Sequence, residues 1–312
     1  MTITTTTLAK ATVTDTPLGA TASRTARFLG PVAATALLAA TLSACGGASG
    51  GSADAGTAAS PSPSPVADKL ADDPLTAVRN AADITGRTGS VQATTQLTTE
   101  SGAKKADFSG SGAYDYGKRI GRLEVQVPPG AATTGKVVEV VEPGIVFLQN
   151  SGAKVPAGKW VKLDVRQLAD GNLISNGATD PATAAAALRG VQQASVVGEE
   201  TVNGVLLKHY KGTLDLAKAA AATGGPAANG LQMAAATFTV KDVPFEAWLD
   251  PQGRLNKVTE VFSFAGVAGS KDPKDQVNVT SSLAFSDFGK PVQITEPPAA
   301  DVVEMTESGS PK

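Results

Sequence analysis

The stretch VPFEAWLDPQGRLNKVTEVFSF, residues 243–264, decides the fold. Residues 243–249 and 254–264 are rich in β-branched and aromatic side chains, and the Asp-Pro-Gln-Gly between them is typical of a turn. A further strand pattern occupies residues 277–288. Strand patterns that follow one another without an intervening helix predict an antiparallel meander.

The rest of the chain extends this arrangement. Asn203-Gly204 lies between two alternating apolar runs and is a strong hairpin signal. We expect a helix over residues 74–85, with Asp72 or Asp73 as its N-cap, and another over residues 182–189. Further strand patterns occupy residues 90–99, 108–116, 123–127, 137–141, 145–148, 160–163, 191–202 and 205–214. The predicted fold class is therefore α+β, with a large curved antiparallel sheet and helices covering one face or mouth.

The N-terminus has the layout of an export signal. Arg24 and Arg27 precede an uncharged apolar run over residues 28–42, which is too short to span a membrane. The run ends in Leu42-Ser43-Ala44-Cys45, which resembles the bacterial lipobox. An ordinary secretory signal with a chance cysteine is the alternative, but Cys45 is the single cysteine of the chain. We therefore predict a signal peptide over residues 1–44 and lipid attachment at Cys45, which anchors the protein to the extracytoplasmic face of the cell membrane.

Composition divides the remaining chain into three parts. Residues 45–67 carry the cysteine and a Gly/Ser/Pro-rich stretch with almost no apolar bulk, which predicts a disordered tether. Residues 68–301 have the composition of one globular domain, and residues 302–312 turn polar, which predicts a loose tail. The net charge of −2 lacks the basic excess of a nucleic-acid-binding protein.

The residues that could carry chemistry do not form a catalytic pattern. His209 is the only histidine, and it lies in a strand pattern between Lys208 and Tyr210 without a nucleophile motif nearby in the sequence. We interpret it as a half-exposed strand residue, and we predict no catalytic residue, no metal site, no cofactor and no enzyme activity.

The apolar pattern suggests a ligand instead. In several predicted strands, apolar residues occupy both odd and even positions, so apolar side chains point to both faces of the sheet. In a sheet with one solvent-exposed face, apolar and polar residues alternate along each strand. The excess apolar surface meets either more protein or an apolar ligand. We predict that one set of apolar residues lines a cavity: Val138, Val140, Val258, Phe262 and Phe264. The alternating pattern leaves open whether the opposite face, with Leu255 and Val261, lines it instead.

Several motifs together resemble a known family. They are the lipobox, the Ser/Pro tether, the Asp73-Pro74-Leu75 helix start, the hairpin over residues 243–255, FSDFGKPV at residues 285–292 and Pro297-Pro298. Over about residues 70–301 the chain is similar to the actinobacterial LppX/LprA/LprF/LprG lipoproteins. The resemblance implies a LolA-like half-open barrel with helices across its mouth, and a hydrophobic cavity for the acyl chains of lipids or glycolipids.

Two functions follow as hypotheses. The first is a non-catalytic envelope lipoprotein that binds or carries lipid or glycolipid acyl chains. The alternative is a sensor or scaffold that contacts a membrane-protein partner through the same fold. The Ala-rich segment at residues 214–238 is either a mobile lid or a low-complexity insertion, and the sequence leaves both open.

The lipobox generates a direct prediction. Replacement of Cys45 by serine removes the thiol that carries the lipid, so the Cys45→Ser protein should leave the membrane fraction. Fractionation after a high-salt wash measures this. Membrane retention of the variant would show that Cys45 is not the anchor.

Overall fold

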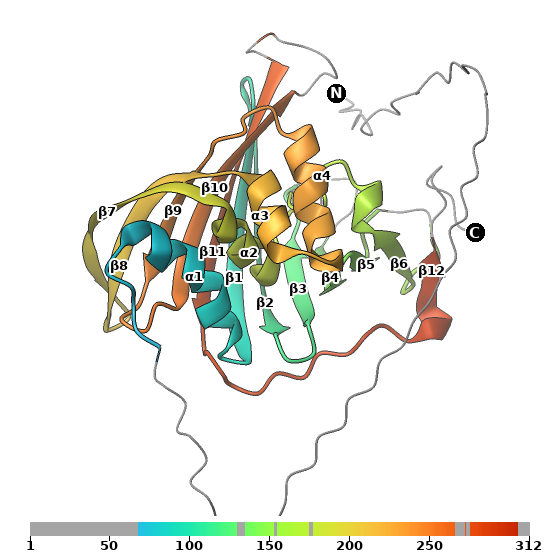
Figure 1. The fold of residues 1–312 in the computed structure, drawn as a ribbon. Helices are drawn as coiled ribbons and strands as arrows, with labels where there is room; N and C mark the ends of the chain where they lie inside the picture. Colours follow the sequence, from blue (N-terminus) through green and yellow to red (C-terminus); the bar gives the residue numbers. More distant parts are fainter. Residues whose placement is uncertain are drawn as a thin grey trace, which may run out of the picture. The chain divides into compact units, whose positions relative to one another are not determined.

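The computed structural model describes residues 68–304, except for residues 130–134, 153–154, 175–176, 266–271 and 273–274. The predicted signal peptide, Cys45 and the tether lie outside the described residues, as does the chain after Glu304. The described domain consists of one sheet and a layer of helices (Figure 1).

The sheet has twelve strands in the order β12-β6-β5-β4-β3-β2-β1-β11-β10-β9-β8-β7 and does not close on itself. Neighbouring strands are antiparallel, apart from the parallel pair β12–β6. This confirms the predicted α+β class with a large curved antiparallel sheet. The strands are β1 (Ser90–Ser101), β2 (Lys104–Asp115), β3 (Ile120–Gln126), β4 (Lys136–Glu142), β5 (Ile145–Gln149), β6 (Trp160–Asp164), β7 (Val191–Val202), β8 (Val205–Leu214), β9 (Val243–Leu249), β10 (Leu255–Ala265), β11 (Gln276–Ser286) and β12 (Val302–Glu304).

Four α-helices lie against the inner face of the curved sheet (Figure 1). Helix α1 (Pro74–Gly86) starts at Asp73, whose carboxylate accepts a hydrogen bond from the backbone N–H of Thr76 at 2.8 Å. Asp180 caps α2 (Pro181–Ala187) in the same way. The other helices are α3 (Leu216–Thr223) and α4 (Asn229–Thr237), and short 3₁₀ turns occupy Val165–Gln167, Leu188–Gly190, Pro226–Ala228 and Ala299–Asp301.

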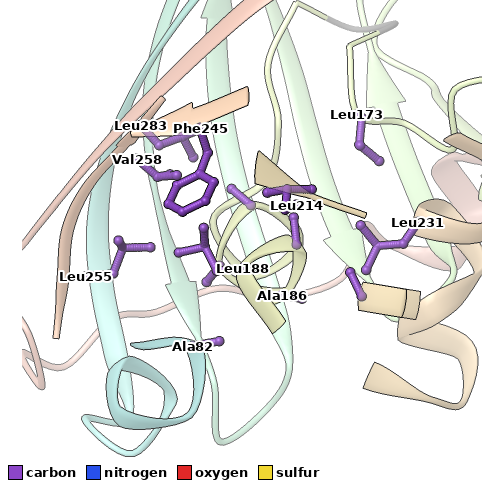
Figure 2. Packing of buried hydrophobic residues seen from close by; sticks show 14 of the residues in the cluster. Ala82, Leu173, Ala186, Leu188, Leu214, Leu231, Phe245, Leu255, Val258 and Leu283 are labelled. Carbon is purple, nitrogen blue, oxygen red and sulfur yellow. The ribbon is translucent and has the colours of Figure 1, made fainter. Parts of the chain in front are cut away.

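The main hydrophobic core lies between the helices and the sheet. Val258 on β10, Leu283 on β11 and Phe245 on β9 belong to one cluster with Leu214, at the end of β8, and Leu188, which follows α2 (Figure 2). Each of these side chains is at most 3% exposed. Because α2 presents mostly alanine, it approaches the sheet closely.

The Ala-rich segment forms α3 and α4, and both helices pack into the domain. Leu216, Ala219 and Leu231 are buried in the main core. Gly171, which has φ +61°, lies so close to α4 that a Cβ atom there would come within 2.0 Å of the Gly230 carbonyl oxygen. The helices therefore complete the inner layer of the domain.

The tail that was predicted to be loose from residue 302 begins with an ordered strand. Val302, Val303 and Glu304 of β12 pair with Trp160–Lys162 of β6. Val302 also packs against a second hydrophobic cluster that includes Trp160. Partial burial of this valine and the backbone pairing explain why a strand forms at the start of a polar segment.

The turn of the decisive hairpin depends on one buried carboxylate. Asp250 is 1% exposed, and its Oδ1 accepts from the backbone N–H groups of Gln252 and Arg254. Its Oδ2 accepts from Arg254 Nε at 2.6 Å. Gly253 has φ +83°, a conformation that costs glycine little.

Asp250→Asn should reduce the free energy of unfolding by about 1.5–3 kcal/mol, because hydrogen bonds to a charged group are lost in a buried turn. Asp287→Asn is the matched control, since Asp287 pairs with Lys290 in a solvent-exposed turn. This control should change stability by at most about 0.5 kcal/mol. Urea unfolding measures both, and equal effects would contradict a special role for Asp250.

Candidate functional site

A pocket of about 570 Å³ lies at one end of the domain, between the inner face of the sheet and the helices. We call it the helix–sheet pocket. Its sheet side includes Tyr114 of β2 and Val141 of β4, and its helical side includes Ala182 and Ala186 of α2. The β4–β5 turn and the C-terminal end of α1 border it. Segments that are far apart in the sequence thus form one concave site.

Two tyrosines form an aromatic wall of the helix–sheet pocket. The ring centroids of Tyr114 and Tyr116 are 4.9 Å apart. Burial raises the pKa of both phenols, so both remain neutral hydroxyls at physiological pH. Tyr116 Oη and Thr223 Oγ1 are buried and have no hydrogen-bond partner among the described residues. Buried polar atoms usually have a partner, so these two hydroxyls have hydrogen-bonding capacity that the described residues do not use.

Buried acidic side chains lie in the pocket lining, as Asp180 does, and behind it, as Glu139 does. Asn172 lines the pocket and donates a hydrogen bond to Oε1 of the fully buried Glu139 on β4. Burial raises the pKa of Glu139 to about 8, and Asp180 and Asp170 nearby act in the same direction. Burial also raises the pKa of Asp180. Glu139 is therefore protonated at neutral pH and lies behind Asn172, outside the pocket lining.

The charged groups lie at the rim. Arg87 pairs with Asp68 and Arg189 pairs with Asp83, each at 2.6 Å. Arg119 is exposed and lies in the turn between β2 and β3. Because both signs of charge are present, the rim does not select strongly for an anion or a cation.

The structure brings together only part of the set that was predicted to line a cavity. Val258 and Phe262 are fully buried in the main core, and the half-buried Phe264 packs against them. Val140 belongs to the second cluster, with Val138 packed against it, on the opposite face of the sheet. None of these five residues lines the helix–sheet pocket.

Leu255 and Val261, the alternative pair on β10, do not lie on the same face of the sheet either. A β-bulge between Leu255 and Lys257 turns Leu255 inward, where it joins Val258 in the core. Val261 stays on the outer side, half-buried beside a shallow surface groove.

Glu260 is an interior residue that the apolar pattern did not reveal. It lies between Val258 and Phe262 on the inward parity of β10 and is 1% exposed. Neither of its carboxyl oxygens has a hydrogen-bond partner in the described part of the chain. Burial raises its pKa to about 8. In the sequence, Glu260 is two residues from both Val258 and Phe262, so its side chain points to the same face as theirs. This spacing is the signal that indicates its burial.

His209 lies on the outer face of the sheet, away from the pocket. Its ring stacks on Trp248 with centroids 4.2 Å apart, and its Nε2 is 2.9 Å from Glu246 Oε2. The sequence did not predict this carboxylate partner. Lys257 Nζ lies 4.4 Å from the centroid of the Trp248 ring. Within the described ranges, no three His, Cys, Asp or Glu side chains gather as metal ligands would.

The fold and the pocket define a class of protein: an α+β domain whose half-open sheet holds helices on its concave side. None of the helices in the described ranges is long and apolar enough to cross a membrane. No protein-family model matches the chain.

Solved structures similar to this chain include two mycobacterial lipoproteins of the family that the motifs resemble. LppX of Mycobacterium tuberculosis has 13% identity and a TM-score of 0.43, with 71% of this chain and 97% of LppX covered. LprF of Mycobacterium bovis has 15% identity and a TM-score of 0.39, with 73% and 99% covered. A LolA superfamily protein of Nitrosomonas europaea has 10% identity and a TM-score of 0.28, with 70% and 93% covered.

One curated relative is an uncharacterised 31.2 kDa protein of Streptomyces griseus, from the rplA-rplJ intergenic region. It is 27% identical over 176 residues, which are 53% of this chain and 52% of that protein. The match thus spans about half the length of the relative.

The buried carboxyl groups predict a stability that falls as pH rises. In the unfolded chain Glu260 ionises near its ordinary pKa of 4.5, whereas in the folded domain it keeps its proton up to about pH 8. Between these values the unfolded state binds fewer protons, so the free energy of unfolding decreases by up to about 1.4 kcal/mol per pH unit for one such group.

Glu260→Gln should remove this contribution. Urea unfolding from about pH 5 to pH 8 should show a shallower pH dependence for the variant, and greater stability than the unmutated protein near pH 8. Glu200→Gln, at an exposed position of β7, is the control and should keep the original slope. An unchanged slope in Glu260→Gln would mean that Glu260 is ionised in the folded domain.

Proposed function

We propose that this protein is a cell-envelope lipoprotein that binds acyl chains of a lipid or glycolipid in the helix–sheet pocket, without catalysing a reaction. The observation that carries the proposal is the pocket itself. Tyrosine rings, valine and the alanines of α2 supply apolar wall, and charged or polar side chains such as Glu142 and Arg119 also line the pocket. Small-molecule sites usually combine apolar walls with polar groups that fix the orientation of the ligand.

The energetics of acyl-chain binding support the proposal. Each CH₂ group that leaves water contributes about 0.8 kcal/mol, so a chain needs no specific polar contact to be held. The pocket volume of about 570 Å³ lies within the usual range of about 300–1,000 Å³ for ligand sites. A pocket of this size accommodates a large part of a long chain.

The unpartnered hydroxyls favour a polar lipid over a plain hydrocarbon. Tyr116 Oη and Thr223 Oγ1 line the same pocket and can bond to ester, hydroxyl or sugar oxygens of the ligand. Membrane lipids and glycolipids carry such oxygens next to their acyl chains, and they are the proposed partners.

We further propose Val258, Phe262 and Phe264 as the continuation of the acyl path. They lie on the inner face of β10, against which α2 packs. A chain longer than the pocket would enter this region by displacing α2 from the sheet. Val138 and Val140 do not belong to this path, because they lie on the outer face.

The proposed location follows from the N-terminal sequence. Lipid on Cys45 would hold the protein on the extracytoplasmic face of the membrane, and residues 46–67 would tether the domain. This arrangement keeps a lipid-binding domain close to its ligands.

Filling the pocket should block binding. Ala182 is half-buried and lines the pocket, so the Ala182→Trp side chain would occupy the acyl site. The affinity for a fluorescent fatty acid should fall by at least about tenfold, while the free energy of unfolding changes by less than about 1 kcal/mol. The anchor-free Cys45→Ser protein is the background for both measurements.

Ala221→Trp is the matched control, since Ala221 is exposed on α3 and does not line the pocket. It should bind the probe normally. Mass spectrometry of lipids extracted from the purified Cys45→Ser protein identifies the ligand class. Absence of both probe binding and extracted lipid would exclude the lipid-binding function.

A further inference from the structure

The exposed large hydrophobic side chains of the described domain all lie on one hairpin, β7–β8. Their exposed fractions range from 40% for Val205 to 50% for Leu206. We call this group the apolar tip: Val196, Val197, Val202, Val205 and Leu206. Concentration of every such residue on one ribbon differs from the scattered exposure that is normal for a surface.

The apolar tip is exposed on both faces of the hairpin. Val202 is opposite Val205, and Thr201 is opposite Leu206, on either side of the Asn203-Gly204 turn. Since successive side chains point to opposite faces, apolar groups project from both sides of the ribbon. A flat protein partner would cover only one of these faces, whereas a surrounding apolar medium covers both.

The register places the apolar tip at the end of the sheet where the described chain begins. On β8, Lys208 pairs with Leu249, so residues 202–206 lie beside the β9–β10 turn. In that turn the carbonyl oxygen of Pro251 accepts a hydrogen bond from the backbone N–H of Leu70 at 3.0 Å. The β2–β3 and β4–β5 turns, which border the helix–sheet pocket, lie at the same end.

This end is also the one closest along the chain to the proposed anchor. Cys45 precedes Asp68 by 23 residues (68 minus 45). A flexible chain of that length has a root-mean-square end-to-end distance of about 25 Å. A lipid on Cys45 would therefore keep the apolar tip and the pocket entrance within reach of the membrane surface.

We propose that the apolar tip inserts into the lipid bilayer and docks the pocket entrance against the membrane. The orientation rests on the proposed function, because it uses the Cys45 anchor and the lipid-binding pocket; insertion rests on the exposed side chains alone. The tip consists of aliphatic residues and lacks the Trp, Tyr and Arg side chains that dominate protein–protein contacts. Two exposed glutamates, Glu199 and Glu200, lie within the tip between Val197 and Val202, so insertion depends on apolar burial and not on attraction to anionic lipids.

Vesicle flotation with the anchor-free Cys45→Ser protein tests insertion. The protein should float with phosphatidylcholine vesicles, with or without phosphatidylglycerol, and high salt should not release it. Adding Val205→Ser and Leu206→Ser should weaken vesicle binding by at least about tenfold. Adding Glu199→Ser and Glu200→Ser in its place is the matched control on the same hairpin and should not weaken binding.

A second measurement reports insertion directly. Leu206→Trp adds an indole to a protein whose two natural tryptophans, Trp160 and Trp248, are buried. Its emission should shift to the blue on addition of vesicles and be quenched by brominated phosphatidylcholine. Unchanged emission, or full vesicle binding by the Val205→Ser/Leu206→Ser protein, would overturn the proposal.

The remaining outcomes separate this proposal from its rivals and from the proposed function. A dimer in solution that dissociates on Val205→Ser/Leu206→Ser, together with no vesicle binding, would assign the tip to a second copy of the chain. Salt-sensitive binding to phosphatidylglycerol alone would overturn insertion. If vesicles bind but a fluorescent fatty acid does not, insertion stands and the lipid-binding function fails. If the fatty acid binds but vesicles do not, insertion fails alone.

Discussion

A strongly curved sheet that does not close must have its inner face covered by something other than its own strands. Here the cover is a layer of short helices, and their composition sets how closely they approach. The alanines of α2 and the Gly171–Gly230 contact let helices lie almost directly on strands and loops. Residues of α1, α2 and α3 meet the end of the sheet around the helix–sheet pocket. The pocket is thus a consequence of how the sheet is covered.

Burial also determines the chemistry of the interior. Glu139 and Glu260 face inward from opposite halves of the sheet, and removal from water raises both pKa values to about 8. A charged carboxylate in this layer would oppose an acyl chain, whereas a protonated one is a neutral hydrogen-bond donor. Because their charge is suppressed, these residues can lie beside an apolar path, while the fixed ion pairs stay at the rim.

Local patterns predicted strands β1 to β11, helices α1 and α2 and the two hairpin turns, because alternation and turn chemistry are properties of short segments. They could not decide which parity of β4 faces inward, since valine occupies residues 137, 138, 140 and 141. The bulge at Leu255 likewise breaks the alternation that would have placed it outward. The pocket joins Tyr116, Glu142, Ala182 and Thr223, whose proximity depends on tertiary packing and has no sequence signature. The N-terminal predictions concern residues outside the described structure.

The two edge strands of the open sheet, β12 and β7, differ in length and in side-chain composition. The difference indicates which surroundings suit the longer edge, β7. Edge β12 has three residues, too short to recruit another strand. Edge β7 has twelve residues, and its outer half combines exposed valines with two glutamates and a bulge between Val196 and Gly198. Charges and bulges on an edge oppose pairing with another chain. An edge that is apolar in its side chains yet protected against strand addition is suited to an environment that covers the side chains while water or headgroup oxygens still bond to the unpaired backbone N–H and C=O groups. A lipid surface has this property, and a second sheet does not.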